Sequence, residues 1–288
     1  MGIEGMMLVG ALAGFATTAM TGSPLLGFAA GIAGGTALSA IHAFLTVSLK
    51  ADQIISGLML TLLGISATTY YGTPWTTASI TGFRKFSLPI VGPYLTATPI
   101  GQVLFHNTLP TFLSFLLVPA VWYFLNHTNL GLVIKAVGED PETADTAGIS
   151  VTRTRYIAVL LGGAFSGAAG AHLSLAFSNL WVSGMVAGRG WIALALVIVV
   201  QWRPVRALVG AYAFGFIDVL QLRTQGIDFV ALVPGSQFDG LVAFLANPTI
   251  MGTYPFVATI LVLTAVSAYS LNEEIGAPGA YLEPYIRS

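Results

Sequence analysis

Long apolar stretches separated by short polar connectors dominate the chain. Stretches long enough, or nearly so, to cross a bilayer cover residues 5–19, 25–49, 54–71, 108–125, 156–177, 207–222 and 249–270. A crossing helix needs about 20 apolar residues, and these stretches are continuous, whereas the strands of a membrane barrel alternate. Two shorter apolar pieces, residues 191–202 and 241–246, suffice for only part of a crossing. The pattern predicts an all-α polytopic transmembrane helical bundle, with residues 1–288 as a single domain and seven or eight helices, some of them broken.

The composition agrees with this pattern and excludes several classes of protein. Hydrophobic residues make up 55% of the chain and charged residues only 8%, and the mean hydropathy is +0.82. Because soluble domains carry about 25% charged residues, the composition argues against a soluble enzyme. The net charge of −1 and the lack of a basic run argue against a nucleic-acid partner. The absence of cysteine excludes disulfides and thiolate metal sites.

Small residues recur at a spacing of four in three of the apolar stretches, so each set lies on one helix face. The residues concerned are Gly10 and Gly14, then Gly27, Gly31 and Gly35, then Gly163 and Gly167. Small residues at this spacing let membrane helices approach each other closely. We interpret these sets as packing faces rather than as a ligand site.

The basic residues indicate which helix ends face the cytoplasm, where lysine and arginine accumulate. The densest charge cluster lies in residues 126–155. If that segment is cytoplasmic, alternation places seven of the 11 basic residues inside, namely Lys50, Lys135, Arg153, Arg155, Arg203, Arg206 and Arg287. The remaining four, Arg84, Lys85, Arg189 and Arg223, then fall outside.

Two single charges flanked by glycine begin apolar stretches in different halves of the chain. Glu4 precedes the first stretch and Arg189 precedes residues 191–202. In the orientation above, these two helices run in opposite directions. This arrangement is typical of an inverted repeat, in which the ends of broken helices point at substrate near the midplane. An equally good interpretation is that each charge caps a helix or reaches the membrane interface.

Isolated polar residues inside the apolar stretches are candidates for a translocation pathway or for chemistry. Gln53, Ser56 and Thr61 follow Asp52, which suits a helix cap, and could form a polar face. His42 and His172 lie inside stretches where polar groups are costly unless they are paired. None of the four histidines has metal-ligand spacing with another ligand, and the sequence has no paired carboxylates, nucleophile elbow or Walker loop. We therefore expect no catalytic residues and no metal site.

The most informative motif spans residues 136–149, between two apolar stretches. Pro141 suits the first turn of a helix, with Asp140 as its cap and Glu142 near its N-terminus. Gly148 suits the end of that helix. The motif predicts a short amphipathic helix on the cytoplasmic face, with Ala144, Ala147 and Ile149 on its buried side, rather than a solvated loop.

At this motif the chain resembles the inner-membrane permeases of ABC importers in the ribose, branched-chain amino-acid and nucleoside family. Residues 136–155 are similar to the cytoplasmic segment that couples such permeases to their ATPase. Residues 2–7, 52–57 and 188–194 are particularly similar to the nucleoside, or simple-sugar-type, permeases. The resemblance covers nearly the whole chain. It assigns the coupling segment to residues 128–154, with contacts made by Gly138, Glu139, Asp140, Pro141, Glu142, Ala144, Asp145, Gly148 and Ile149.

The resemblance implies a multi-pass protein of the cytoplasmic membrane that translocates nucleosides or related sugar-like solutes. Its partners would be a cytoplasmic ABC ATPase that binds ATP and Mg²⁺, a second and different permease subunit, and an extracytoplasmic solute-binding protein. The chain itself would bind no cofactor. The pathway residues would be Glu4, Gln53, Ser56, Thr61 and Arg189.

In two places the chain departs from that family. The family usually has a hydrophobic segment before the piece that matches residues 2–7, so we expect either that the start has been assigned too late or that the chain is shortened and lacks one helix. The position of Thr61 usually carries asparagine. Two other functions stay open on the sequence: a stand-alone facilitator or channel for a small polar solute, and an intramembrane enzyme that uses His42 or His172.

Overall fold

The computed structural model describes residues 2–86, 106–224, 239–269, 278–281 and 284–285. Within these residues, six helices are long and apolar enough to cross a membrane, and two shorter apolar helices accompany them. The chain divides into two compact units, residues 1–191 with 278–288 and residues 192–277. The all-α polytopic bundle expected from the hydrophobic pattern is confirmed. Almost every predicted apolar stretch forms a helix, and the observed helix ends lie close to the predicted ones.

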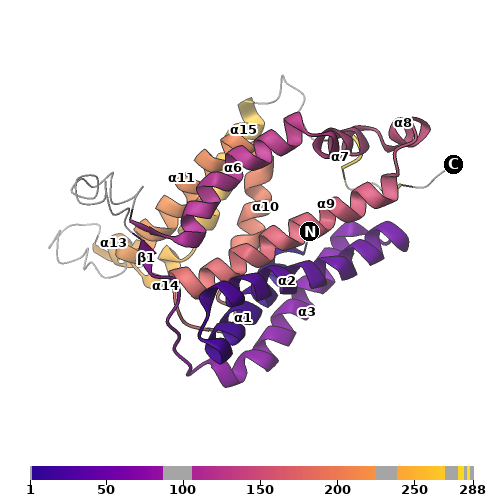
Figure 1. The fold of residues 1–288 in the computed structure, drawn as a ribbon. Helices are drawn as coiled ribbons and strands as arrows, with labels where there is room; N and C mark the ends of the chain where they lie inside the picture. Colours follow the sequence, from indigo (N-terminus) through magenta and orange to yellow (C-terminus); the bar gives the residue numbers. More distant parts are fainter. Residues whose placement is uncertain (1, 87–105, 225–238, 270–277, 282–283, 286–288) are drawn as a thin grey trace. The chain divides into compact units, whose positions relative to one another are not determined.

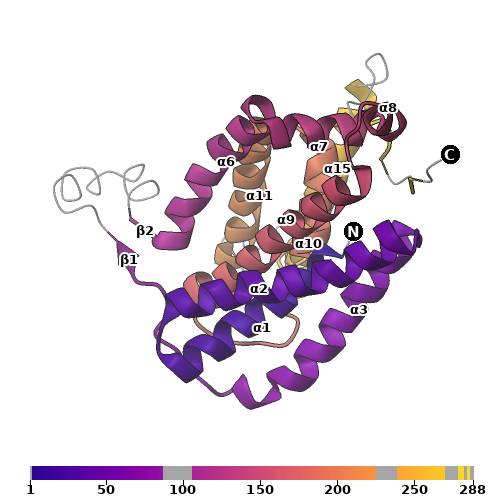
Figure 2. The ribbon, with the colours of Figure 1, turned by 45° about the vertical axis from the view of Figure 1, so that its right-hand side comes forward.

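Four helices of the first unit pack side by side and are called the helix cluster below. They are α1 (Ile3–Thr21), α2 (Pro24–Ala43), α3 (Gln53–Gly72) and α9 (Val151–His172). Both ribbon views show α1 and α2 lying along α9 (Figures 1 and 2). Two of these helices end in π-helical turns, α2 in η1 (Phe44–Ser48) and α9 in η3 (Leu173–Phe177).

Glycine allows the helix cluster to pack backbone against backbone, as the spacing of small residues predicts. A Cβ atom on Gly10 of α1 would lie 2.5 Å from the carbonyl oxygen of Gly167 and 2.6 Å from its Cα. Such distances are shorter than any side chain tolerates, so only glycine fits at this crossing. The small-residue faces are therefore packing faces, and the large apolar side chains on the outer faces are left for lipid.

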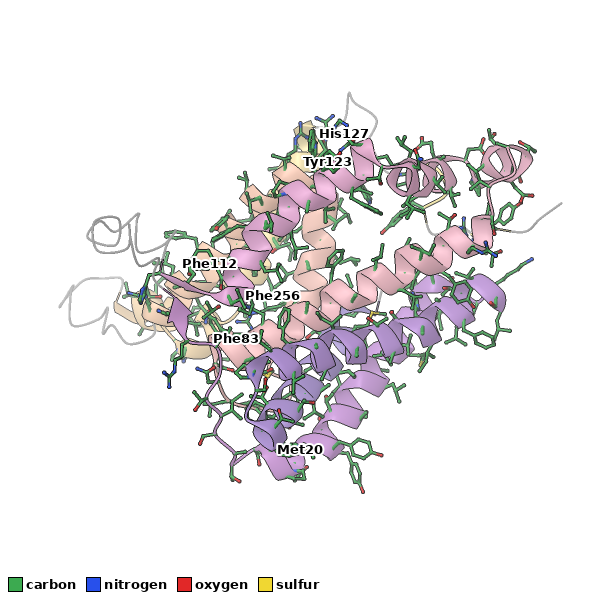
Figure 3. The ribbon with its side chains drawn as sticks, in the orientation of Figure 1. Met20, Phe83, Phe112, Tyr123, His127 and Phe256 are labelled. Carbon is green, nitrogen blue, oxygen red and sulfur yellow. The ribbon has the colours of Figure 1, made fainter. Side chains whose placement is uncertain are left out.

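The connection after α3 runs through η2 (Thr73–Trp75) to β1 (Lys85–Phe86), which pairs antiparallel with β2 (Asn107–Thr108). Helix α6 (Leu109–His127) follows and carries Pro119 in its interior. Most side chains of α6 are exposed, and at its end Tyr123 stacks on His127 with the ring centroids 5.1 Å apart (Figure 3). Tyrosine rings are common at the membrane interface, so this stack marks the end of the crossing.

The segment between α6 and α9 folds into two short helices, α7 (Asn129–Glu139) and α8 (Pro141–Thr146). Figure 1 shows both at the start of α9, away from the end where α9 enters η3. The second unit contains most of α10 (Arg189–Val199), with α11 (Pro204–Thr224), α13 (Asp239–Leu245), α14 (Pro248–Met251) and α15 (Tyr254–Tyr269).

Helix α10 has 11 residues, so it is too short to cross a bilayer, as the sequence predicts. It ends before Gln201 and Trp202, two residues with left-handed backbone angles (φ 54° and 55°). The inverted repeat and the single-domain organisation stay predictions.

Candidate functional site

The coupling segment contains the predicted short helix, and Asp140 caps it as expected. Oδ1 of Asp140 accepts hydrogen bonds from the backbone N–H groups of Glu142 and Thr143, each at 3.0 Å, and Oδ2 accepts one from the Thr143 hydroxyl at 2.5 Å. These bonds, with that from the Thr143 hydroxyl the strongest, lower the pKa of the exposed Asp140 carboxyl below its ordinary value. The cap therefore depends on an ionised carboxylate.

The end of α8 has the geometry of a Schellman motif. The N–H of Ile149 donates to the carbonyl of Ala144 at 3.0 Å, and the N–H of Gly148 donates to that of Asp145 at 2.9 Å. Gly148 has φ +83°, a left-handed angle that glycine adopts without strain. The stop signal predicted at Gly148 is thus explained by backbone geometry.

A small apolar cluster fastens the coupling segment to the membrane helix that follows it. Val137 of α7, Ala144 of α8 and Val151 of α9 are buried against one another, with Ile149 packed at their side. Because Val151 is the first residue of α9, this cluster joins α8 directly to the start of α9. Ala147 was expected on this buried side, but it is exposed. That expectation was wrong because α8 ends at Thr146 and Ala147 is its C-cap residue, so the buried face of the helix does not continue to it.

The opposite side of the segment is polar and exposed. Its acidic side chains come from the end of α7, the connection and the first turn of α8, and are those of Glu139, Asp140 and Glu142. Pro141 is half-buried beside them. Asp145 is half-buried as well and interacts with a neighbour, so it does not share this outer face. The outer face is thus compact and acidic, and a partner could contact it without unfolding the segment.

Residues near the end of the chain return to the coupling segment, which the sequence did not reveal. The backbone N–H of Ala280 donates to the carbonyl of Gly138 at 3.0 Å, and Tyr285 packs against the apolar cluster. A Cβ on Gly138 would make only an ordinary contact with Pro278 at 3.7 Å. Gly138 therefore contributes its carbonyl to this contact, and a small side chain would fit there.

Glu4 lies inside the first unit, where it caps a helix from the other half of the sequence. Its carboxylate accepts hydrogen bonds from the N–H of Gly188 at 2.8 Å and of Gly190 at 2.7 Å, at the start of α10. Glu4 is 7% exposed, so these bonds form away from solvent. The two predicted glycine-flanked charges are thus brought together at the start of α10, where Glu4 caps the helix.

Arg189 turns back toward the connection that precedes α10. Its Nη1 donates to the carbonyl oxygens of Met185 at 3.4 Å and Val186 at 3.3 Å. The guanidinium therefore stabilises the turn next to the Glu4 carboxylate.

Two of the three predicted pathway residues of α3, Ser56 and Thr61, are buried. Ser56 is hydrogen-bonded to Nδ1 of His42 at 2.9 Å, and both side chains are buried. The hydroxyl of buried Thr61 donates to the carbonyl of Gly57 at 3.0 Å. Gln53 is half-buried in the first turn of α3. Ser56 and Thr61 thus satisfy their hydrogen bonds within helix contacts, and a pathway role for the three residues stays a prediction.

The described residues contain no group of three or more histidine and acidic side chains that could hold a metal ion. Nδ1 of the buried His42 is hydrogen-bonded to the hydroxyl of Ser56, whereas orientation for proton transfer is usually the task of a carboxylate.

Comparison with known proteins gives a consistent result over the whole chain. A family model described as branched-chain amino acid transport system / permease component matches residues 1–235. A Haloferax volcanii protein, provisionally named a glucose ABC transporter permease, is 55% identical over 100% of this chain and 88% of its own length.

Two further relatives are named for nucleosides. The guanosine ABC transporter permease of Bacillus subtilis is 30% identical over 99% of this chain and 87% of its own length. The nucleoside ABC transporter permease of Lactococcus lactis is 33% identical over 100% of this chain and 87% of its own length. No solved structure matches the chain.

Proposed function

From the premise that the chain belongs to the family of branched-chain amino acid transport system permease components, we propose that it carries a sugar or a nucleoside. The chain is a multi-pass membrane permease subunit of an ABC importer. Permeases of this family work with an ATPase and a substrate-binding protein. The relatives named for glucose, guanosine and nucleosides support a solute with several hydroxyl groups.

The observation that carries the mechanism is the connection between α8 and the helix cluster. The acidic outer face of the coupling segment, with Glu139, Asp140 and Glu142, docks on the ATPase. The apolar contacts of Ala144 and Val151 then pass its motion to α9. Because α9 packs along α1 and α2, closure of the ATPases shifts the cluster between two states, each favoured by a different ligand.

The remaining parts of the proposal concern partners and the pathway. ATP and Mg²⁺ bind to the partner ATPase, where hydrolysis occurs, and this chain binds no cofactor. A second, different permease subunit completes the path across the membrane. Gln53 and Arg189 contact the passing solute, while Glu4 holds the N-terminus of α10 beside them. Ser56 and Thr61 shape the path through the helices they pack.

Uptake by the assembled importer tests the coupling role. Glu142→Lys reverses a charge on the exposed outer face, so we expect uptake into proteoliposomes to fall about tenfold through the loss of electrostatic complementarity. Asp52→Asn is the matched control, because it also removes an exposed carboxylate at the expected cytoplasmic side while an amide can still cap α3. Membrane insertion of both variants should equal that of the unaltered protein.

The same assay separates the importer from the stand-alone facilitator. Uptake that persists in Glu142→Lys and without any ATPase would show a facilitator. Labelled glucose, with unlabelled guanosine as competitor, then distinguishes the solutes, since only a recognised solute binds the receptor and lowers uptake of the label.

A further inference from the structure

A cavity of about 170 Å³ lies between the coupling segment and the cytoplasmic end of α2. Its walls come from η1, from the connection between α8 and α9, from the first turn of α9 and from the returning chain end. The polar residues that line it include Lys50, Asp145, Ser150, Thr152, Arg155 and Tyr285. All of these belong to the first unit.

The charge of the lining favours an anion. Lys50 and Arg155 contribute two positive charges and Asp145 one negative charge, so the lining is positive overall. Arg155 and Asp145 each interact with a neighbour. Ser150 occupies the N-cap position of α9 but makes no capping hydrogen bond with its side chain. The positive end of the α9 dipole therefore faces the same cavity.

Lys50 has a backbone conformation that lysine seldom adopts. Its φ is +56°, in the left-handed region where glycine is favoured. The N–H of Ala51 donates to the carbonyl of Leu45 at 2.9 Å, so Lys50 lies in the turn that ends the helix continuing from α2. A glycine would serve that turn better, and the strain indicates that the side chain has a use of its own.

The cavity lies at the ends of two helices that are long and apolar enough to cross a membrane. The span Pro24–Ser48 ends just before Lys50, and the span Val151–Phe177 begins within the lining. The hydroxyls of Ser48 and Tyr156 are hydrogen-bonded at 2.5 Å and join the two helix ends beside the cavity. Basic pockets between membrane helices on the cytoplasmic side bind phospholipid headgroups.

We propose that this cavity binds a phosphate group, supplied by an anionic phospholipid of the cytoplasmic leaflet or by free phosphate. The phosphate oxygens accept hydrogen bonds from Lys50, Arg155 and the first turn of α9. The bound group thereby links the end of α2 to the coupling segment, so its occupancy stiffens the connection through which α8 moves α9. Assignment to the cytoplasmic leaflet rests on the proposed function, whereas the binding site itself does not.

Binding of short-chain lipids to the purified full chain tests the proposal. Dihexanoyl phosphatidylglycerol is titrated into the protein in neutral detergent, with dihexanoyl phosphatidylcholine as the uncharged comparison. We expect one site for phosphatidylglycerol, and Lys50→Gln should weaken it about fivefold because one cationic contact is lost. Arg153→Gln is the matched control, because it removes an exposed charge from the first turn of α9 that does not line the cavity. This variant should bind phosphatidylglycerol as the unaltered protein does.

Lys50→Gly separates binding from folding. Glycine relieves the left-handed strain, so this variant should melt at a higher temperature while binding phosphatidylglycerol as weakly as Lys50→Gln. Asp145→Asn should strengthen binding, because it removes the negative charge from the lining.

Inorganic phosphate identifies the source of the group. If millimolar phosphate displaces the lipid, the site binds both free phosphate and the phospholipid headgroup. If it does not, the site binds the phospholipid alone. Equal binding by Lys50→Gln and the unaltered protein, or equal binding of phosphatidylcholine, would overturn the proposal. None of these measurements needs an ATPase, so the proposed transport function is tested separately.

Discussion

The helix cluster and the coupling segment are both closely packed, but different atoms make their contacts. In the cluster, glycine brings backbones together, as where Gly10 meets Gly167. In the coupling segment, a charged side chain, Asp140, satisfies the helix end, and three small apolar residues form the core. The difference follows from the surroundings, since lipid offers no hydrophobic drive between helices, whereas water at the cytoplasmic face favours apolar burial and ionised caps.

Breaking the backbone contact should have the largest effect. Gly167→Ala places a methyl group against the carbonyl of Gly31 and 3.0 Å from Cα of Gly35, where backbone on both sides prevents relaxation. We expect a loss of roughly 3 kcal/mol in the free energy of unfolding, the upper end for overpacking. Denaturation in detergent, followed by circular dichroism, measures this loss.

Gly162→Ala is the matched control in the same helix. Its Cβ would meet nothing within 4 Å, so alanine should stabilise α9 by about 0.5–1 kcal/mol through helix propensity. If both variants lost the same stability, close approach of the backbones would not be what holds the cluster together.

Glu4 is the exception within the cluster, because it is a buried charge that caps a helix as Asp140 does. Glu4→Ala removes the acceptor from the buried N–H of Gly190 and the half-buried N–H of Gly188, so we expect a loss of about 2 kcal/mol. Glu4→Gln keeps one acceptor oxygen and should lose less. Hydrogen exchange at Gly188 and Gly190 measures the effect directly, and unchanged protection in Glu4→Ala would contradict the cap.

The contrast also explains how much could be predicted from the sequence. Helix bounds and the Asp140 cap depend on neighbouring residues, so apolar length and local signals sufficed for them. The hydrogen bond between Glu4 and Gly188 joins residues that are 184 positions apart in the sequence. The contact of Ala280 with Gly138 likewise joins distant segments. Such pairings are set by how helices assemble. The sequence identified Glu4 as unusual but could not say which helix it caps.

Polar residues in the apolar stretches were ambiguous for a related reason. The spacing of Ser56 and Thr61 places them on one face of α3, but it does not say whether that face meets a pathway or another helix. The structure places Ser56 against His42 of α2. A buried hydroxyl needs a hydrogen-bond partner in either setting, so residue type alone cannot distinguish the two.

The smallest effect should come from titrating the cap of the coupling segment. The pKa of Asp140 is lower in the folded protein than its ordinary value of 3.8, so its ionised form is favoured by folding. Its contribution is therefore fully present above that ordinary value and is lost as the pH falls through the lowered pKa. The amides of Glu142 and Thr143 should lose exchange protection over this range, with the pH dependence of intrinsic exchange subtracted.

Asp140→Asn retains an acceptor oxygen that does not titrate, so in this variant the amides of Glu142 and Thr143 should show a weaker but pH-independent protection. Protection that changed with pH equally in both proteins would assign the effect to another group. It would also remove the charged cap as the feature that distinguishes the coupling segment from the helix cluster.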